Sequence, residues 1–148
     1  MLLVCTVGVA TTATTAATAE DEVIVVVVNK ANAAKTLDRD ELRLIFQTTK
    51  RSWSDGENVT PYNLPDDSSL RHGFDAAVLG LDPERVARYW IDRKIRGDAH
   101  PPSELLSTAL VVKAVAKNKG AIGYVAKGDA NDTVKVVARV VRGQVVAP

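Results

Sequence analysis

The sequence has little of the chemistry on which most enzymes and metal sites depend. It holds one cysteine and two histidines, and His72 and His100 lie in different segments of the chain. No group of histidine, cysteine and carboxylate residues has the spacing of metal ligands. A P-loop and a glycine-rich dinucleotide fingerprint are also missing. Ser69, His72 and Asp75 follow one another at intervals of three on one predicted helix, a spacing that cannot supply the geometry of a catalytic triad. We therefore expect no enzyme, no cofactor and no metal ion.

A strong charge of either sign is also absent. The 148 residues include 19 Lys and Arg against 18 Asp and Glu, a net charge of +1. Nucleic-acid binding relies on a clustered basic surface that releases counterions, and the sequence shows no such cluster. We therefore expect no nucleic-acid partner. The composition, 46% hydrophobic and 25% charged, is that of an ordinary globular domain, and the length suits one domain.

Residues 1–19 carry no charged side chain. The apolar run 1–10 has the length of the hydrophobic region of a signal peptide and is too short to span a bilayer. The tract that follows ends in Ala17-Thr18-Ala19, which fits an A-x-A cleavage site. We interpret 1–19 as a signal-peptide-like segment, the alternative being a frayed tail rich in alanine and threonine. This predicts export to the periplasm or the medium and a mature domain, 20–148, without stable membrane insertion. Cys5 lies in the segment, so the mature protein would hold no disulfide.

The mature chain alternates predicted strands and helices. The uninterrupted β-branched run 23–28 predicts a strand covered on both faces, which is typical of a parallel sheet. A short strand at 59–62 contains Pro61, which favours a sheet edge or a strand end. Further strands are predicted at 121–125 and 134–140. Together with the helices, this order predicts an α/β fold with three layers.

Four helices are predicted from their start signals and apolar spacing. Asp38 and Glu41 form a capping box for the first helix, whose Leu42, Ile45 and Phe46 should face the sheet. The second helix begins at Ser68 or Ser69 and ends at Gly80. The third has Asp82 as its cap and Pro83 at its first position, and the fourth covers about 108–118, with Gly120 as its terminator.

The start of the second helix is the candidate binding site. A helix N-terminus presents free backbone N–H groups and the positive end of a dipole, which suits an oxyanion. Ser68, Ser69 and Leu70 would supply these groups, and Arg71 in the first turn could add a guanidinium. The simpler interpretation makes Ser68 an N-cap and Arg71 a solvated charge. Asp66 and Asp67 lie beside the junction and oppose an anion through their like charge.

Four stretches of the sequence resemble motifs of the phosphate-type periplasmic solute-binding proteins of ABC transporters, which have the type II periplasmic binding protein fold. They are the strand Val25-Val26-Val27-Val28-Asn29, the helix Leu37 to Phe46 followed by Trp53, the loop Ser68-Ser69-Leu70-Arg71 with Phe74, and the strand Gly120-Ala121-Ile122-Gly123-Tyr124-Val125. The third resembles the family's Ser-Gly-Thr-Arg ligand loop, and the last matches its Gly-Ala-Ile-Gly-Tyr-Val strand. In order, they cover 23–137 and resemble one of the family's two lobes.

The resemblance implies a single α/β lobe, equal to half of a type II binding protein. It implies an exported solute-binding protein without enzymatic activity, which binds phosphate or another small oxyanion weakly through Ser68, Ser69, Leu70 and Arg71. An ABC permease or an envelope protein is the implied partner. The family has glycine and threonine where this chain has Ser69 and Leu70, so one hydroxyl contact is lost. That departure favours the alternative, an accessory or protein-interaction domain that kept the lobe fold and lost the ligand.

Overall fold

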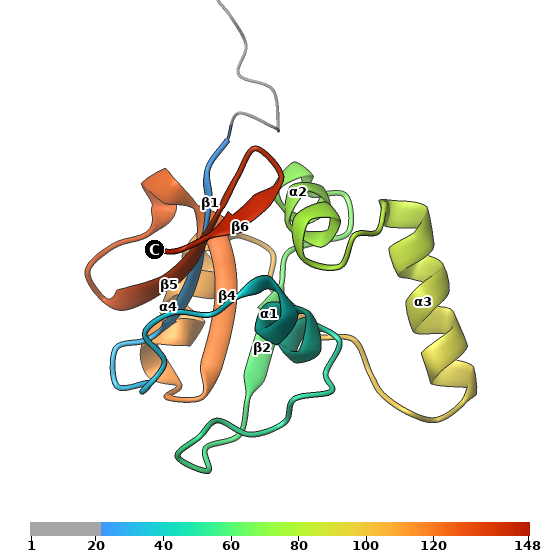
Figure 1. Ribbon diagram of the computed structural model, residues 1–148, viewed down its shortest axis with the longest axis horizontal. Coiled ribbons are helices and arrows are strands. Elements are labelled where there is room, and N and C mark those ends of the chain that lie inside the picture. The colour runs from blue at the N-terminus through green and yellow to red at the C-terminus, as the bar shows by residue number, and fades with distance from the viewer. Residues whose placement is uncertain (1–21) are drawn as a thin grey trace, which may run out of the picture.

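The computed structural model describes residues 22–148, which form a mixed six-stranded sheet with helices on both faces (Figure 1). The signal-peptide-like segment predicted at 1–19 lies outside the described residues. The strands follow the order β3-β2-β4-β1-β5-β6 across the sheet. In chain order the elements are β1 (Ile24–Asn29), α1 (Arg39–Phe46), β2 (Thr60–Asn63), α2 (Ser69–Val78), α3 (Pro83–Ile95), β3 (Ser103–Glu104), α4 (Thr108–Lys117), β4 (Ala121–Ala126), a 3-10 turn (Lys127–Asp129), β5 (Val134–Val141) and β6 (Gln144–Val146).

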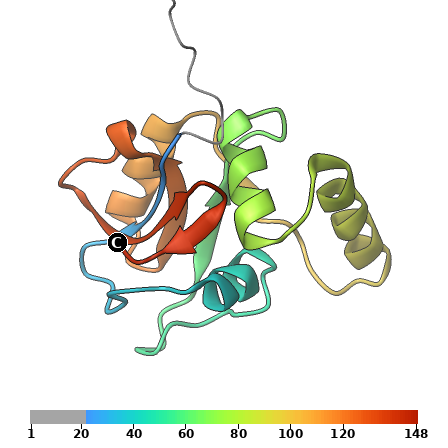
Figure 2. The ribbon, with the colours of Figure 1, turned by 45° about the horizontal axis from the view of Figure 1, so that its top comes forward.

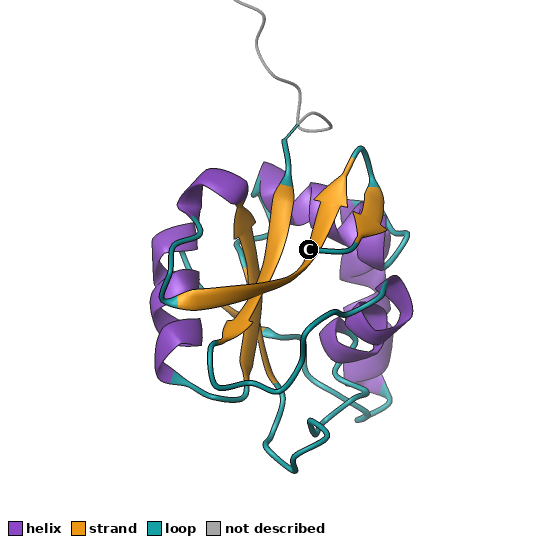
Figure 3. Cartoon of the chain, turned by 60° about the vertical axis from the view of Figure 1, so that its left-hand side comes forward, coloured by secondary structure: helices purple, strands orange, loops and turns teal. Residues whose placement is uncertain are grey.

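The three layers predicted from the sequence are confirmed. Helix α4 covers one face of the sheet, and α1 and α2 cover the other (Figure 3). Two consecutive residues of β4, whose side chains point to opposite faces, show both contacts. A Cβ at Gly123 would lie 2.4 Å from a methyl group of Val111 on α4, whereas Tyr124 stacks on Phe74 of α2 with ring centroids 3.9 Å apart. Helix α3 lies farthest from the sheet and packs beside α2 (Figure 2).

The central strand β1 is buried on both faces as predicted, but its direction differs from the prediction. It pairs antiparallel with β4 on one side and with β5 on the other; Val26 lies opposite Tyr124 and Ala138. The run of valines indicates only that both faces of the strand are covered. The prediction of a parallel neighbour was wrong, because burial on both faces does not determine the direction of the neighbouring strands.

Strand β2 lies next to the edge of the sheet and not at it. It runs parallel to β4 on one side and to the two-residue strand β3 on the other. The N–H of Thr60 donates to the carbonyl of Gly120, so the nitrogen of Pro61, one residue later, faces away from β4. Strand β3 pairs only with Tyr62 and Asn63. Pro61 therefore sits where no ladder hydrogen bond is required.

The predicted helix starts are confirmed. Asp38, Ser68 and Asp82 are the N-caps of α1, α2 and α3, and Asp38 with Glu41 forms a complete capping box. Leu42, Ile45 and Phe46 are buried.

Gly120 has a different role from the one predicted. Helix α4 ends at Lys117, and a Cβ on Gly120 would lie only 1.9 Å from the carbonyl oxygen of Asn58. This glycine is therefore required for close backbone approach, where the chain enters β4.

Candidate functional site

The first turn of α2 brings the predicted binding residues together. The hydroxyl of Ser68 accepts a hydrogen bond from the N–H of Arg71 at 3.4 Å. The N–H groups of Ser69 and Leu70 precede the first intrahelical bond, and neither has a partner among residues 22–148. Ser69 is exposed, and Leu70 packs partly against the core. This turn therefore presents two free N–H donors.

Arg71 is not the solvated charge that the simpler interpretation expected, because its side chain is buried. Its Nη1 donates to the carbonyl of Leu64 and to a carboxylate oxygen of Glu104, both at 3.0 Å. Its Nε lies 3.4 Å from a carboxylate oxygen of Asp75, one turn along the helix. The guanidinium thus joins the residue that follows β2, helix α2 and strand β3, and it has a structural role whatever else it does.

A cavity of about 250 Å³ lies beside this guanidinium, between α2, α3 and the segment that leads into β3. The Nη2 of Arg71 makes no hydrogen bond to a described residue. Since no buried polar side-chain atom of 22–148 lacks a partner, Nη2 reaches the solvent. The cavity is also lined by Asp66, Asp75 and Glu104, so carboxylates outnumber the cation. The guanidinium of Arg71 therefore lies in a cavity whose other charged side chains are carboxylates.

Burial perturbs two titratable groups in this region. It raises the pKa of Asp75 from 3.8 to about 6, although the charge of Arg71 acts in the opposite direction. Burial also raises the pKa of the Tyr124 hydroxyl. That hydroxyl accepts from the N–H of Leu64 and donates to the side-chain oxygen of Asn63. Tyr124 is therefore a neutral part of the buried network beneath the site.

The raised pKa of Asp75 predicts a specific dependence of stability on pH. Between pH 3.8 and about 6 the folded protein holds a proton on Asp75 that the unfolded chain has released. The contribution of this group to the free energy of unfolding therefore falls as pH rises through this window, by about 2–3 kcal/mol, and is constant above it. Urea unfolding of the wild type and of Asp75→Asn at a series of pH values measures the difference.

We expect the stability difference between Asp75→Asn and the wild type to change across this window in favour of the variant. Asp67→Asn, which replaces an exposed carboxylate of the same region, is the matched control. Parallel curves for the wild type and Asp75→Asn between pH 4 and pH 6 would contradict the prediction.

Sequence reasoning missed the two acidic partners of Arg71. Asp75 could have been found, because a basic and an acidic residue four positions apart lie on one helix face. Glu104 carries no such signal; it reaches Arg71 only through the pairing of β3 with β2.

The described part of the chain offers no metal centre and no membrane span. Within 22–148, no group of three or more histidine, cysteine or acidic side chains could hold a metal ion. None of the helices in this range is long and apolar enough to cross a bilayer.

A family model described as a PBP superfamily domain matches residues 21–147. No curated protein has a sequence that matches this chain.

Solved structures with a similar fold include an ABC-type phosphate transport receptor from Vibrio cholerae, with a TM-score of 0.63 and 19% sequence identity. A protein from Clostridium perfringens solved with bound phosphate has a TM-score of 0.63 at 20% identity, and PstS from Borrelia burgdorferi has 0.60 at 12%. Each comparison covers 78% of this chain but only 45%, 44% and 46% of the respective relative. At these identities the similarity establishes the fold alone. It confirms that the chain has the fold of one lobe, since it spans less than half of each of these proteins.

Proposed function

We propose that this chain, which belongs to the family of PBP superfamily domains, is a solute-binding lobe without enzymatic activity that takes phosphate or a similar small oxyanion at the N-terminus of α2. The contacts would be the N–H groups of Ser69 and Leu70, the Ser68 hydroxyl and the guanidinium of Arg71. The observation that carries the proposal is the first turn of α2, where the N–H groups of Ser69 and Leu70 have no partner among residues 22–148 and the guanidinium-bearing Arg71 is the next residue. Both kinds of donor suit an oxyanion.

The proposed binding is weak for two reasons. A single lobe leaves the oxyanion in contact with water, where each ionic contact contributes far less than in an enclosed cleft. Asp66 and Glu104 also line the cavity beside Arg71 and repel an anion. We therefore expect a Kd near the millimolar end of the scale, about −4 kcal/mol in binding free energy.

The proposal includes export and a protein partner. The charge-free segment 1–19 with its Ala17-Thr18-Ala19 site supports export to the periplasm or the medium. An ABC permease or an envelope protein would then receive the ligand, as the names of the similar structures suggest for phosphate transport.

A second candidate function is an accessory or protein-interaction domain that kept the lobe fold and lost the ligand. It is favoured by the internal pairing of Arg71 with Asp75 and Glu104. Leu70, which lacks a hydroxyl and packs against the core, favours it as well.

Titration of inorganic phosphate and sulfate into the isotope-labelled full chain, followed by NMR, distinguishes the two functions. We expect saturable shifts of the amide signals of 66–72 at roughly millimolar phosphate. Arg71 is not replaced in this test because its ion pairs hold the fold. Instead, Ser69→Asp places a carboxylate in the exposed first turn, where the helix dipole favours it, and should abolish the shifts without unfolding the chain.

Ala109→Asp is the matched control, since it makes the same kind of change in the first turn of α4. It should leave the phosphate shifts at 66–72 unchanged. Absence of any shift at tens of millimolar phosphate, in a folded protein, would exclude the oxyanion site and leave the interaction domain.

A further inference from the structure

A second cavity, of about 430 Å³, lies where α1 and α3 end beside β2. One wall is the segment 48–51 that follows α1, and the opposite wall is the loop 97–100 that follows α3. Val59 and Pro61 form its apolar side. Strand β3 does not extend along this part of β2, so the edge of the sheet is open here. This cavity shares no lining residue with the one beside Arg71.

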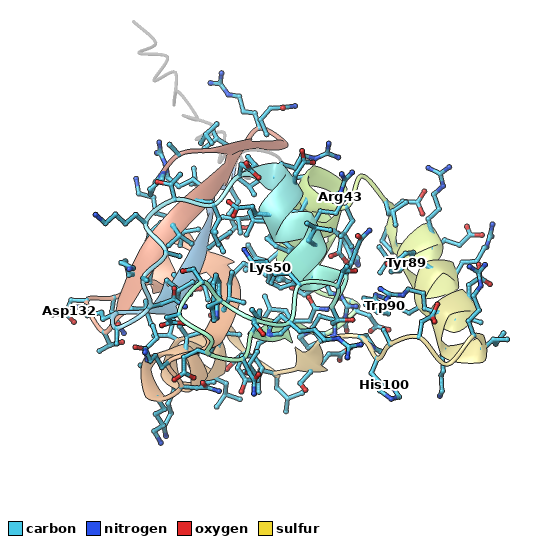
Figure 4. The ribbon with its side chains drawn as sticks, turned by 60° about the horizontal axis from the view of Figure 1, so that its bottom comes forward. Arg43, Lys50, Tyr89, Trp90, His100 and Asp132 are labelled. Carbon is cyan, nitrogen blue, oxygen red and sulfur yellow. The ribbon has the colours of Figure 1, made fainter. Side chains whose placement is uncertain are left out.

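The charges that line this cavity are mainly positive. Lys50 and Arg51 come from the first wall, and the single carboxylate, Asp98, comes from the second, which also carries His100. Lys50 and His100 are labelled in Figure 4. The only ion pair of Lys50 within 22–148 is a long one with Glu41, 3.6 Å between partly exposed side chains. Arg51 is exposed and has no ion-pair partner among the described residues. Lys50 also lies over the Trp53 ring, 5.8 Å from its centroid, but neither cation is buried in its contacts as Arg71 is.

The first wall contains one residue, Thr48, in a strained backbone conformation. Helix α1 ends in a pair of hydrogen bonds from Thr48 to Ile45 and from Thr49 to Leu44, a geometry that requires a left-handed residue at position 48. Glycine is favoured there, yet the residue is Thr48, with φ of 57°. Its hydroxyl donates to the carbonyl of His100 at 3.3 Å.

A second tie joins the ends of the two helices that precede these walls. The guanidinium of Arg93 on α3 donates to the carbonyl of Gln47, the C-cap residue of α1. The strained Thr48 thus ties the wall that holds Lys50 and Arg51 to the loop 97–100, and Arg93 ties together the helices that precede these two segments. Strain of this kind persists where the surrounding structure maintains a site.

We propose that this cavity binds a small organic anion, with a phosphate or carboxylate group held by Lys50 and Arg51 and an apolar body against Val59 and Pro61. The volume is in the range of small-molecule sites and exceeds what a bare phosphate needs. Lys50 and Arg51 supply the attraction for the anionic group, and the apolar side supplies contact area for the body. Lys50 and Arg51 are neighbours in the sequence, and the fold brings them together with Val59, Pro61 and the loop 97–100. This site does not depend on the proposed oxyanion site at α2.

NMR titration of the labelled full chain with phenyl phosphate, benzoate and phenol tests the proposal. Phenyl phosphate should give saturable shifts at 48–51, 59 and 97–100 at roughly millimolar concentration, and added salt should weaken binding. Comparison with benzoate shows whether the site prefers a phosphate or a carboxylate. Phenol, which has the same ring and no charge, should give no saturable shift.

The double variant Lys50→Gln/Arg51→Gln should weaken phenyl phosphate binding by about fivefold to tenfold or abolish it. Arg88→Gln, on the exposed face of α3, is the matched control and should bind as the wild type does. The proposal is overturned if phenyl phosphate gives no saturable shift in the folded protein. It is also overturned if phenol gives the same shifts, if the double variant binds unchanged, or if the shifts fall only at 66–72. Binding of inorganic phosphate at 66–72 is a separate outcome, so the two proposals can fail independently.

Discussion

Replacing Phe46 by alanine is expected to lower the free energy of unfolding by about 3–5 kcal/mol. The side chain is 2% exposed and belongs to a cluster of three aromatic rings. It meets Phe74 edge-on with centroids 4.6 Å apart and Tyr124 at 5.8 Å. Truncation removes the buried ring and leaves a cavity between α1, α2 and the sheet, because Phe74 and Tyr124 are held against each other and cannot fill it.

Urea unfolding of the full chain measures this loss. Leu44→Ala is the matched control, since Leu44 belongs to the same helix but is 42% exposed, and it should cost less than about 1 kcal/mol. Equal losses for the two variants would show that α1 does not pack as described.

Arg71→Ala is expected to cost a similar amount, about 3–5 kcal/mol, for an electrostatic reason. It removes the hydrogen bond to Leu64 and leaves Asp75 buried without its cation. The loss should be smaller at pH 5 than at pH 8. Without Arg71 the pKa of Asp75 rises above its present value of about 6, so at low pH the carboxyl is protonated and neutral in the folded state.

Two further variants separate this effect from a general loss of charge. Arg88→Ala breaks an ion pair between exposed side chains and should change stability by less than about 0.5 kcal/mol. Combining Arg71→Ala with Asp75→Asn should cost about 1–3 kcal/mol less than the sum of the single losses, because the second change removes the unpaired carboxylate. Additive losses would mean that the two side chains do not interact.

The helices could be predicted from the sequence because their signals are local. Asp38, Ser68 and Asp82 cap helices through bonds that span three residues, and the buried faces follow from apolar spacing. The strands were located for the same reason, but their partners were not, since pairing joins segments that no local pattern connects. Strand β6 was missed because its hairpin turns at Arg142 and Gly143, both with positive φ, where arginine replaces the usual asparagine or aspartate.

In the candidate site, too, the local features could be predicted from the sequence and the long-range contacts could not. Ser68, Ser69 and Leu70 lie where the helix start placed them, and whether they bind an oxyanion stays a prediction. The burial of Arg71 could not be deduced, because it depends on Glu104 and Leu64, which the sheet brings to the guanidinium. The cavity at Lys50 and His100 had no sequence signal at all, since its walls are the ends of two helices that meet only in the folded chain.

The position of β1 at the centre of the sheet sets the order in which this protein can fold during synthesis. Its partners β4 and β5 follow α4 in the sequence, so Val26 meets Tyr124 and Ala138 only after the whole segment between them has been made. The helices can form earlier, but they have no sheet to pack on until then. Closing such distant contacts costs loop entropy before any burial is gained, which slows folding relative to proteins of local contacts. The segment between β1 and β4 therefore stays without a stable core until β4 and β5 have been made, in the state that chaperones bind and proteases cut.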